Sequence, residues 1–394
     1  MFTLQQLLVQ MPQWKTFLPP GSHKVFGLIE RCHSAALGYH HYKCSDKGCG
    51  HSHYVYHSCR NRHCPQCGTA RAGQWMEERL GELLPVKYFH VVFTLPAELS
   101  GIAMGNRKAM FKLLFDASSH CLLSLCRDEK RLGAIPSVTS VLHTWGQQLN
   151  FHPHVHCIVR AGGADEKKQW KPLKKGNGNF LFPYKVMEPL FKGYFLDRLI
   201  TLIEQGEVKF PAKTNWKELK KGLYKKEWII HAKQPFGNAS QVIEYLGRYT
   251  QKIAISNHRI QNIDAQNKVS FSYKDYADNS KRKSMTLEGE EFLKRFSLHI
   301  LPPGFVRIRH YGILGNNKRR KTVAQILKNM KVPEHPLPVN TPLAIRLLSM
   351  YGKDIALCPK CGKSTLILVS VVHPPARAGP SLINPMWKKK TMTA

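Results

Sequence analysis

The stretch "NFHPHVHCIV", residues 150–159, places three histidines at alternate positions ahead of an apolar run. Successive side chains of a β-strand point to opposite faces, so His152, His154 and His156 would share one face of a strand. Neutral imidazole is the commonest metal ligand in proteins, and three imidazoles in phase favour a cation site. The alternative is a half-buried strand whose histidines form local hydrogen bonds. We expect the metal-binding strand.

The charge of the chain indicates a polyanionic partner. Its 394 residues include 59 Lys and Arg but only 26 Asp and Glu, which gives a formal net charge of +33. Such an excess repels itself unless a polyanion is bound, so nucleic acid is the expected partner, with strongly salt-dependent binding. The longest aliphatic stretch, residues 366–372, is too short to span a bilayer, and we expect no membrane partner.

The cysteines indicate metal binding in a reducing compartment. The N-terminus lacks a basic region and a cleavage site, so no signal peptide is expected. Without a secretory signal, an odd count of eleven cysteines favours metal sites over disulfides. The expected compartment is the cytoplasm.

Hydrophobic patterning predicts strands and helices in alternation between about residues 85 and 300. Residues 88–95 are typical of a buried strand, and the basic, Gly-rich residues 162–179 of a hairpin. Helical periodicity marks residues 106–127, 188–206 and 238–260, the last capped by Asn238. This alternation favours an α/β or α+β sandwich.

Six cysteines fall within the first 80 residues, in a segment that predicts zinc binding. Cys44 with Cys49, and Cys64 with Cys67, form two pairs whose separation suits a tetrahedral zinc site. Reduced cysteines in an apolar core are the alternative. A second Cys2His2 set would use the ligands left over in the same segment, namely Cys32, His40, Cys59 and His63. Between them, Arg60 and Arg62 are candidates for phosphate contacts. Farther on, Cys358 and Cys361 supply half a zinc site or a simple turn.

Two tyrosines share a face of the third predicted helix. Tyr245 and Tyr249 are spaced i, i+4, with Gly247 between them and with Arg248 and Lys252 placed to hold a phosphate. Two tyrosines on an amphipathic helix are usually core residues. A tyrosine hydroxyl can, however, attack a phosphodiester, and a cation on a neighbouring strand would polarise that phosphate.

Together these motifs resemble a known family. A strand with "HVH" and a helix with two tyrosines is similar to the HUH single-strand endonucleases. The segments "SCRNRHCPQC", "FHPHVHCIV", "YLGRYTQKIAIS" and "GFVRIRHYGILGN", in this order, look like the two-tyrosine rolling-circle transposases of bacterial insertion sequences, the insertion-sequence-91-like group. The resemblance covers about residues 25–320.

The resemblance implies an α+β fold: an HUH endonuclease domain, with an antiparallel sheet flanked by helices, preceded by a small zinc-binding domain. We expect a zinc- and DNA-binding domain at residues 1–80, the catalytic domain at 85–300 and a basic C-terminal region at 301–394. The expected location becomes the bacterial cytoplasm, on the nucleoid. The oligomeric state is not predicted.

The resemblance also assigns roles to the site residues. His154 and His156 become ligands of a catalytic Mg²⁺ or Mn²⁺, beside structural Zn²⁺, and the two tyrosines become nucleophiles. The third ligand varies in the family; strand geometry favours His152, with Gln147 or Gln148 as substitutes. Imidazoles suit transition metals better than magnesium, so Mn²⁺ would reconcile the two arguments.

The implied activity is nicking and rejoining of single-stranded DNA at transposon ends, through 5′-phosphotyrosine intermediates, with target DNA as the second substrate. A rolling-circle replication initiator would use the same chemistry on another substrate. A zinc-dependent DNA-binding regulator would need neither tyrosine, and a metal phosphodiesterase would use water instead of tyrosine.

Overall fold

The structure, a computed structural model, describes residues 2–67, 79, 81–173, 181–211, 214–233, 236, 241–242, 247, 253–315, 317–333, 345, 348, 352 and 354–374. The chain divides into two compact units. Unit 1 comprises Met1–Glu30 and Cys59–Pro342, and unit 2 comprises Arg31–Ser58 and Leu343–Ala394. These units cut across the three consecutive segments that the sequence predicts, because each is built from two separate stretches.

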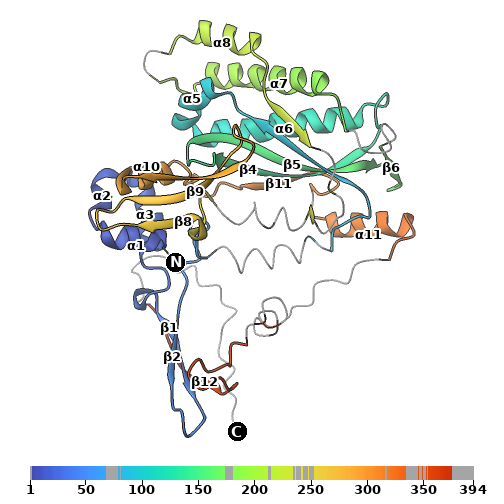
Figure 1. The fold of residues 1–394 in the computed structure, drawn as a ribbon. Helices are drawn as coiled ribbons and strands as arrows, with labels where there is room; N and C mark the ends of the chain where they lie inside the picture. Colours follow the sequence, from blue (N-terminus) through green and yellow to red (C-terminus); the bar gives the residue numbers. More distant parts are fainter. Residues whose placement is uncertain are drawn as a thin grey trace. The chain divides into compact units, whose positions relative to one another are not determined.

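A six-stranded antiparallel sheet forms the centre of unit 1 (Figure 1). Its main path runs β11-β4-β5-β3-β7, and β6 pairs with β5 off this path. The strands are β3 (Tyr88–Thr94), β4 (Ile135–Trp145), β5 (Phe151–Ala164), β6 (Trp170–Pro172), β7 (Ile230–Lys233) and β11 (Ile308–Gly312). The predicted buried strand is β3, the histidine strand is β5, and the predicted hairpin is formed by β5 and β6.

Helices cover one face of this sheet. They are η2 (Ala97–Leu99), α5 (Ser100–Gly105), α6 (Arg107–Arg127), α7 (Tyr184–Glu204) and α8 (Trp216–Lys225). α6 contacts β4, β5 and α7, and α8 lies beyond α7 (Figure 1). The ring centroids of Phe93 on β3 and Phe191 on α7 are 4.9 Å apart, within the core. The helices predicted at 106–127 and 188–206 are therefore confirmed as α6 and α7.

One described helix, α6, is long and apolar enough to cross a membrane. Two thirds of its most apolar window are buried inside the protein, as in the core helix of a globular domain. The helix predicted at 238–260 lies mostly outside the described residues, and Gln241, Val242 and Gly247 are helical. It does not extend to residue 260 as predicted, because residues 253–256 are not helical and η4 and β8 follow them.

A second layer of unit 1 joins N-terminal helices to a small sheet. The helices are α1 (Leu4–Gln10), α2 (Trp14–Phe17) and α3 (Pro20–Glu30). The sheet has the order β10-β9-β8, preceded by η4 (Asn257–Arg259), with β8 (Ile260–Ile263), β9 (Val269–Asp275) and β10 (Lys281–Leu287). α10 (Gly289–Ser297) and α11 (Arg319–Asn329) follow. Thr3 forms a capping box with Gln6 at the start of α1, and Phe26 packs on Phe296.

Unit 2 contains η1 (Ala35–Leu37) and a three-stranded antiparallel sheet of order β12-β1-β2. Its strands are β1 (Tyr39–Cys44), β2 (Ser52–Tyr56) and β12 (Leu366–Val372). Strand β1 is central because residues near both ends of the chain pair with it; Cys44, for example, stands opposite Leu366. The predicted α+β class, with antiparallel sheets flanked by helices, is confirmed.

Candidate active site and metal centres

Three histidines converge on one face of the central sheet. The ligand nitrogens of His143, His154 and His156 all lie within 4.8 Å of one another. His154 and His156 alternate along β5, and His143 stands directly opposite His154 on β4. Directly opposed residues of an antiparallel pair point to the same face, so the hairpin register assembles the three imidazoles.

Neighbouring groups fix the orientation of two of these rings. His154 Nδ1 donates to the His152 carbonyl oxygen at 2.6 Å. His156 Nδ1 lies 2.7 Å from His90 Nε2 on β3, and the two rings are nearly parallel, with an interplanar angle of 1°. A histidine whose Nδ1 carries the proton presents an Nε2 lone pair to a cation.

The electrostatics of His154 favour its neutral imidazole, which is the ligand form. Burial, with a smaller contribution from the charge of His152, lowers the pKa of His154 to about 4. Three imidazole nitrogens fit a transition-metal ion such as Zn²⁺ better than Mg²⁺, which prefers oxygen ligands. The residues present therefore fit a divalent metal centre with imidazole ligands.

The third member of the cluster corrects the sequence prediction. His152 supplies a backbone carbonyl to His154 instead of a ring nitrogen to the cluster. The amide oxygen of Gln147 accepts from the backbone of Lys274, and the Gln148 carbonyl accepts from Arg295. His143 was missed because its position depends on the pairing of β4 with β5. The signal was the short connection between "SVLHTW" and "FHPHVH", which is typical of a hairpin.

The predicted nucleophiles, Tyr245 and Tyr249, lie outside the described residues, as do Arg248 and Lys252. Val242, three residues before Tyr245, is described. Val242 is buried in a cluster with Tyr88, Val141 and Ile158. Val141 pairs with His156, and Ile158 is two residues farther along β5, so both belong to the face that carries the histidines. The described part of the segment therefore packs against the histidine face.

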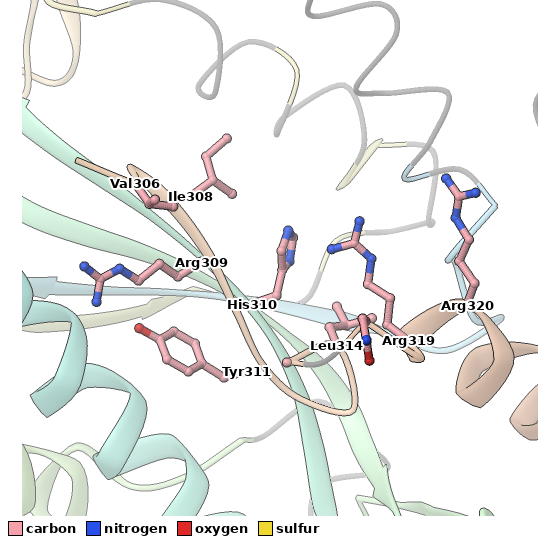
Figure 2. Close-up of a pocket in the computed structure, with 10 residues that line it drawn as sticks. Val306, Ile308, Arg309, His310, Tyr311, Leu314, Arg319 and Arg320 are labelled. Carbon is pink, nitrogen blue, oxygen red and sulfur yellow. The ribbon is translucent and has the colours of Figure 1, made fainter. Parts of the chain in front are cut away.

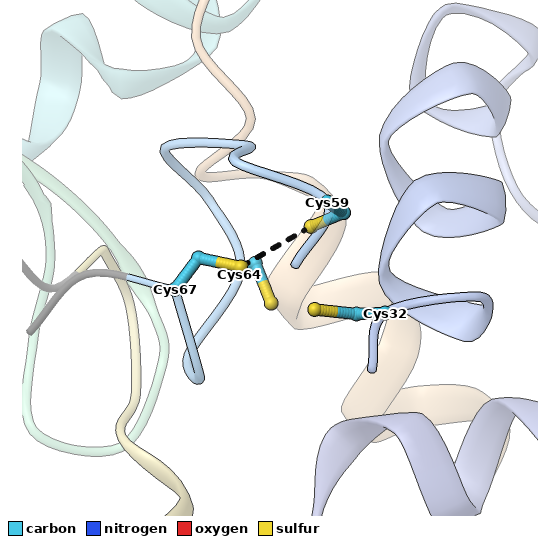
Figure 3. Close-up of side chains that lie close together, drawn as sticks. All are labelled: Cys32, Cys59, Cys64 and Cys67. Carbon is cyan, nitrogen blue, oxygen red and sulfur yellow. Dashed lines mark hydrogen bonds between the residues drawn. The ribbon is translucent and has the colours of Figure 1, made fainter. Parts of the chain in front are cut away.

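One cysteine cluster brings together four thiols from residues 32–67. The sulfurs of Cys32, Cys59, Cys64 and Cys67 lie within 4.8 Å of one another (Figure 3). Cys59 and Cys67 are the pair joined in Figure 3, with their sulfurs 3.5 Å apart. Four thiols at this spacing suit the closed tetrahedral coordination of structural zinc.

A second cysteine cluster lies in unit 2. Cys44 Sγ is 3.7 Å from Cys361 Sγ, and Cys49 Sγ is 3.8 Å from Cys358 Sγ. A tight turn presents the second pair, because the Gly362 amide donates to the Cys358 carbonyl at 2.8 Å. The backbone N–H of Lys363 is the main cause that lowers the pKa of Cys361, to about 7, whereas burial and the neighbouring thiols raise the pKa of Cys49.

The cysteine grouping corrects the sequence prediction, since Cys44 and Cys49 do not join Cys64 and Cys67. Neither predicted histidine ligand joins a cluster. His63 Nε2 accepts from the Leu301 amide at 3.0 Å, and its Nδ1 contacts the Asn61 side chain. His40 Nδ1 instead contacts His57 Nε2 at 3.0 Å. Local spacing misled the prediction because the true partner pair of Cys44 and Cys49 comes from residues 358–361.

The two arginines of this segment have different environments. Arg62 donates to the carbonyls of Phe305 at 2.5 Å and Pro302 at 3.2 Å, and burial lowers its pKa. Its guanidinium thus holds a loop of unit 1, which does not support the predicted phosphate contact. Arg60 is exposed, with a positive φ of 52°.

Comparison with known proteins identifies both parts of the chain. Residues 137–321 match a family model described as "Putative transposase", and residues 4–95 match a "Transposase zinc-binding domain". "Putative transposase y4qJ" of Sinorhizobium fredii is 39% identical over 90% of this chain and 91% of its own length. "Transposase for insertion sequence element IS801" of Pseudomonas savastanoi pv. phaseolicola is 29% identical over 76% of this chain and 72% of its own.

A solved structure, the metal-bound conjugative relaxase TrwC in complex with oriT DNA, is 12% identical, with 81% of this chain and 98% of that chain covered. Its TM-score of 0.26 is too low for it to contribute to the assignment. The two family models and the 39% identical relative suffice. The chain belongs to the insertion-sequence-91-like transposases, which carry an N-terminal zinc-binding domain.

Proposed function

We propose that this transposase nicks and rejoins single-stranded DNA at transposon ends, as a rolling-circle enzyme with tyrosine nucleophiles. The observation that carries the proposal is the cluster of His143, His154 and His156, on the sheet face against which Val242 packs. Val242 begins the segment that carries Tyr245 and Tyr249. Val242, a described residue of that segment, therefore lies on the same face as the cation site, and this supports the proposal.

The tyrosines would act by direct displacement. The phenol oxygen of one tyrosine attacks the scissile phosphorus and loses its proton, while the bond from phosphorus to the 3′ oxygen breaks and that oxygen leaves as a hydroxyl. The 5′-phosphotyrosine keeps the bond energy, so a 3′-hydroxyl can later displace the tyrosine and rejoin DNA without a nucleotide cofactor. While the first phosphotyrosine persists, the second tyrosine can cut another strand, such as target DNA.

The histidines would hold the cation that this attack needs, because a phenol of pKa about 10 is a weak nucleophile at neutral pH. A bound Mn²⁺ or Mg²⁺ supplies Lewis-acid polarisation of the scissile phosphate and stabilises its developing charge. The contacts of His154 with the His152 carbonyl, and of His156 with His90, would keep the rings aimed at the ion.

The two cysteine clusters would each hold one structural Zn²⁺. This assignment rests on four converging sulfurs in each cluster and on the match to a transposase zinc-binding domain. Arg60, which is exposed beside Cys59, would contact DNA. These sites would then act as folding elements and not as reaction centres.

The deciding experiment is incubation with a labelled single-stranded oligonucleotide that carries an element end, in Mn²⁺, followed by a denaturing gel. We expect a protein–DNA band that survives denaturation, weakens in Tyr245→Phe or Tyr249→Phe, and disappears in the double variant. Tyr224→Phe, an exposed tyrosine on α8, is the matched control and should keep the band.

Other outcomes select the competing functions. Cleavage without a covalent band would indicate a phosphodiesterase that uses water. Specific binding of cognate ends without cleavage would indicate a regulator. The same band formed on a plasmid origin, and not on transposon ends, would indicate a replication initiator.

A further inference from the structure

Three arginines surround a single carboxylate near the β11 edge of the central sheet. Glu82 Oε1 lies 3.2 Å from Arg79 Nη2 and 3.0 Å from Arg319 Nε. Arg160, on β5, donates to the Glu82 backbone carbonyl and lies over the ring of Tyr88. We call these four charged residues, Arg79, Glu82, Arg160 and Arg319, the arginine cluster.

The arginine cluster carries more positive charge than its carboxylate neutralises. Arg79, Glu82 and Arg160 are only 6%, 3% and 4% exposed. Among the described residues, Arg160 Nη1 is buried and has no hydrogen-bond partner. His310 adds no charge, because burial and the nearby arginines lower its pKa to about 3. Buried charge is costly unless it is paired, so this arrangement calls for an anion.

One member of the arginine cluster, Arg319, lines a pocket beside β11 and the start of α11. The pocket has a volume of about 760 Å³ and is lined by His310, Arg319 and Arg320, among others. Figure 2 shows these three side chains on the same side of the strand, with Arg309 and Tyr311 on the other. α11 begins at Arg319 and has no acidic residue in its own first turn, so the positive end of the helix adds to the charge of Arg319 and Arg320.

The pocket belongs to the same face as the histidines. His310 stands opposite Thr139 on β4, and its Nδ1 lies 3.0 Å from the Thr139 hydroxyl. Thr139 and His143 are on the same strand four residues apart, which corresponds to about 13 Å along a strand. A single strand with one phosphate at the histidines would therefore reach the pocket with a phosphate a few nucleotides away, and not with the adjacent one.

We infer that the pocket lined by Arg319 and Arg320 binds a backbone phosphate of the single-stranded DNA whose scissile phosphate occupies the histidine site. This inference rests on the proposed function for its substrate. The buried arginines hold Arg319 through Glu82, and Arg319 and Arg320 contact the phosphate. This contact recognises the charge of the phosphate and not the identity of the base. It therefore positions the strand for cleavage without selecting its sequence.

The test is fluorescence anisotropy of the full-length, zinc-loaded protein with a labelled single-stranded oligonucleotide, measured over a series of salt concentrations. We expect Arg319→Gln and Arg320→Gln each to weaken binding on the order of tenfold at low salt. The slope of log affinity against log salt should fall by about 0.7 for each lost contact. Lys221→Gln, an exposed cation on α8 beyond the opposite face of the sheet, is the control.

Arg320→Gln guards against misfolding, because Arg320 is exposed and its loss removes no buried contact. A loss of affinity and slope at either arginine, beyond that of Lys221→Gln, supports the site. The inference is overturned if Arg319→Gln and Arg320→Gln both match Lys221→Gln in affinity and in the slope of log affinity against log salt. A wild-type protein that binds the oligonucleotide but forms no covalent band would refute the proposed function while leaving this binding comparison intact.

Discussion

The histidine cluster and the cysteine cluster of unit 2 are both metal-type donor sets, but the chain assembles them in opposite ways. The histidines lie within one hairpin, residues 143–156, and strand pairing alone brings them together. The cysteines come from residues 44–49 and 358–361, at opposite ends of the chain. One set is therefore local in the sequence, whereas the other depends on closing almost the entire chain.

This difference determines what each metal would stabilise. The entropic cost of closing a loop grows only slowly with its length. Metal binding can therefore offset the cost of joining two ligand pairs that are far apart in the sequence. The strand β12 reaches β1 through the same closure. The distal zinc would consequently fold unit 2, whereas the histidine metal would bind a hairpin already formed by the central sheet.

The largest expected effect follows from Cys361→Ser, which removes one ligand of the unit 2 cluster. Structural zinc contributes about 10–16 kcal/mol of apparent binding energy in zinc-finger peptides, so loss of a ligand should unfold the β12-β1-β2 sheet. We expect zinc content to fall from two ions per chain to one, by atomic emission. Limited proteolysis should then cut within unit 2 and spare unit 1.

Cys126→Ala is the matched control for this prediction, because Cys126 is buried in α6 and joins neither described cluster. It should keep both zinc ions. Two ions retained in Cys361→Ser would mean that the distal pair is not a ligand pair.

The next largest effect separates His143 from His152. His143→Ala removes a proposed ligand, and the metal concentration that gives half-maximal cleavage of the oligonucleotide should rise at least a hundredfold. His152→Ala keeps the backbone carbonyl that His154 contacts, so its effect should be much smaller. Titration of cleavage rate against Mn²⁺ makes the comparison. Equal effects of the two substitutions would restore His152 as the third ligand.

The same contrast explains how far the sequence could predict the structure. Local patterns located β3, β5, α6 and α7, because periodicity and strand composition are properties of short segments. Cross-strand pairing brings His143 into the histidine cluster, and long-range pairing brings Cys358 and Cys361 into the cysteine cluster of unit 2. A sequence pattern carries neither register nor topology. Likewise, Arg62 was predicted to contact DNA phosphate, but its guanidinium donates to the Phe305 carbonyl and so holds a loop of unit 1.

A smaller effect is expected at His90, whose ring contacts the proposed metal ligand His156. His90→Gln retains a side-chain acceptor, its amide oxygen, near His156 Nδ1, whereas His90→Leu removes it. Loss of such a partner typically costs 10–100-fold in metal affinity or activity. We expect His90→Leu to raise the Mn²⁺ requirement for cleavage by about this factor, and His90→Gln to recover part of it. Equal metal requirements in both variants would argue against a positioning role.

The smallest effect concerns the turn that closes the histidine hairpin. His299 Nε2 donates to the Leu149 carbonyl at 3.1 Å, and its Nδ1 lies 3.2 Å from the Thr144 hydroxyl. Burial lowers the pKa of His299 to about 4, whereas an unfolded histidine titrates near 6.5. Between these values the unfolded chain binds the proton, so stability falls as pH decreases, by about 1.4 kcal/mol per pH unit from this residue.

Urea unfolding between pH 5.0 and 7.5 measures this dependence. His299→Gln keeps a donor toward Leu149 but cannot titrate, so its free energy of unfolding should depend less on pH than that of the wild type. Thr144→Val removes the hydroxyl and leaves the imidazole, so it should lower stability at every pH and keep the wild-type slope. An unchanged slope in His299→Gln would place the pH sensitivity elsewhere. A reduced slope would show that protonation of His299 loosens the locally assembled hairpin, independently of the distant closure that forms unit 2.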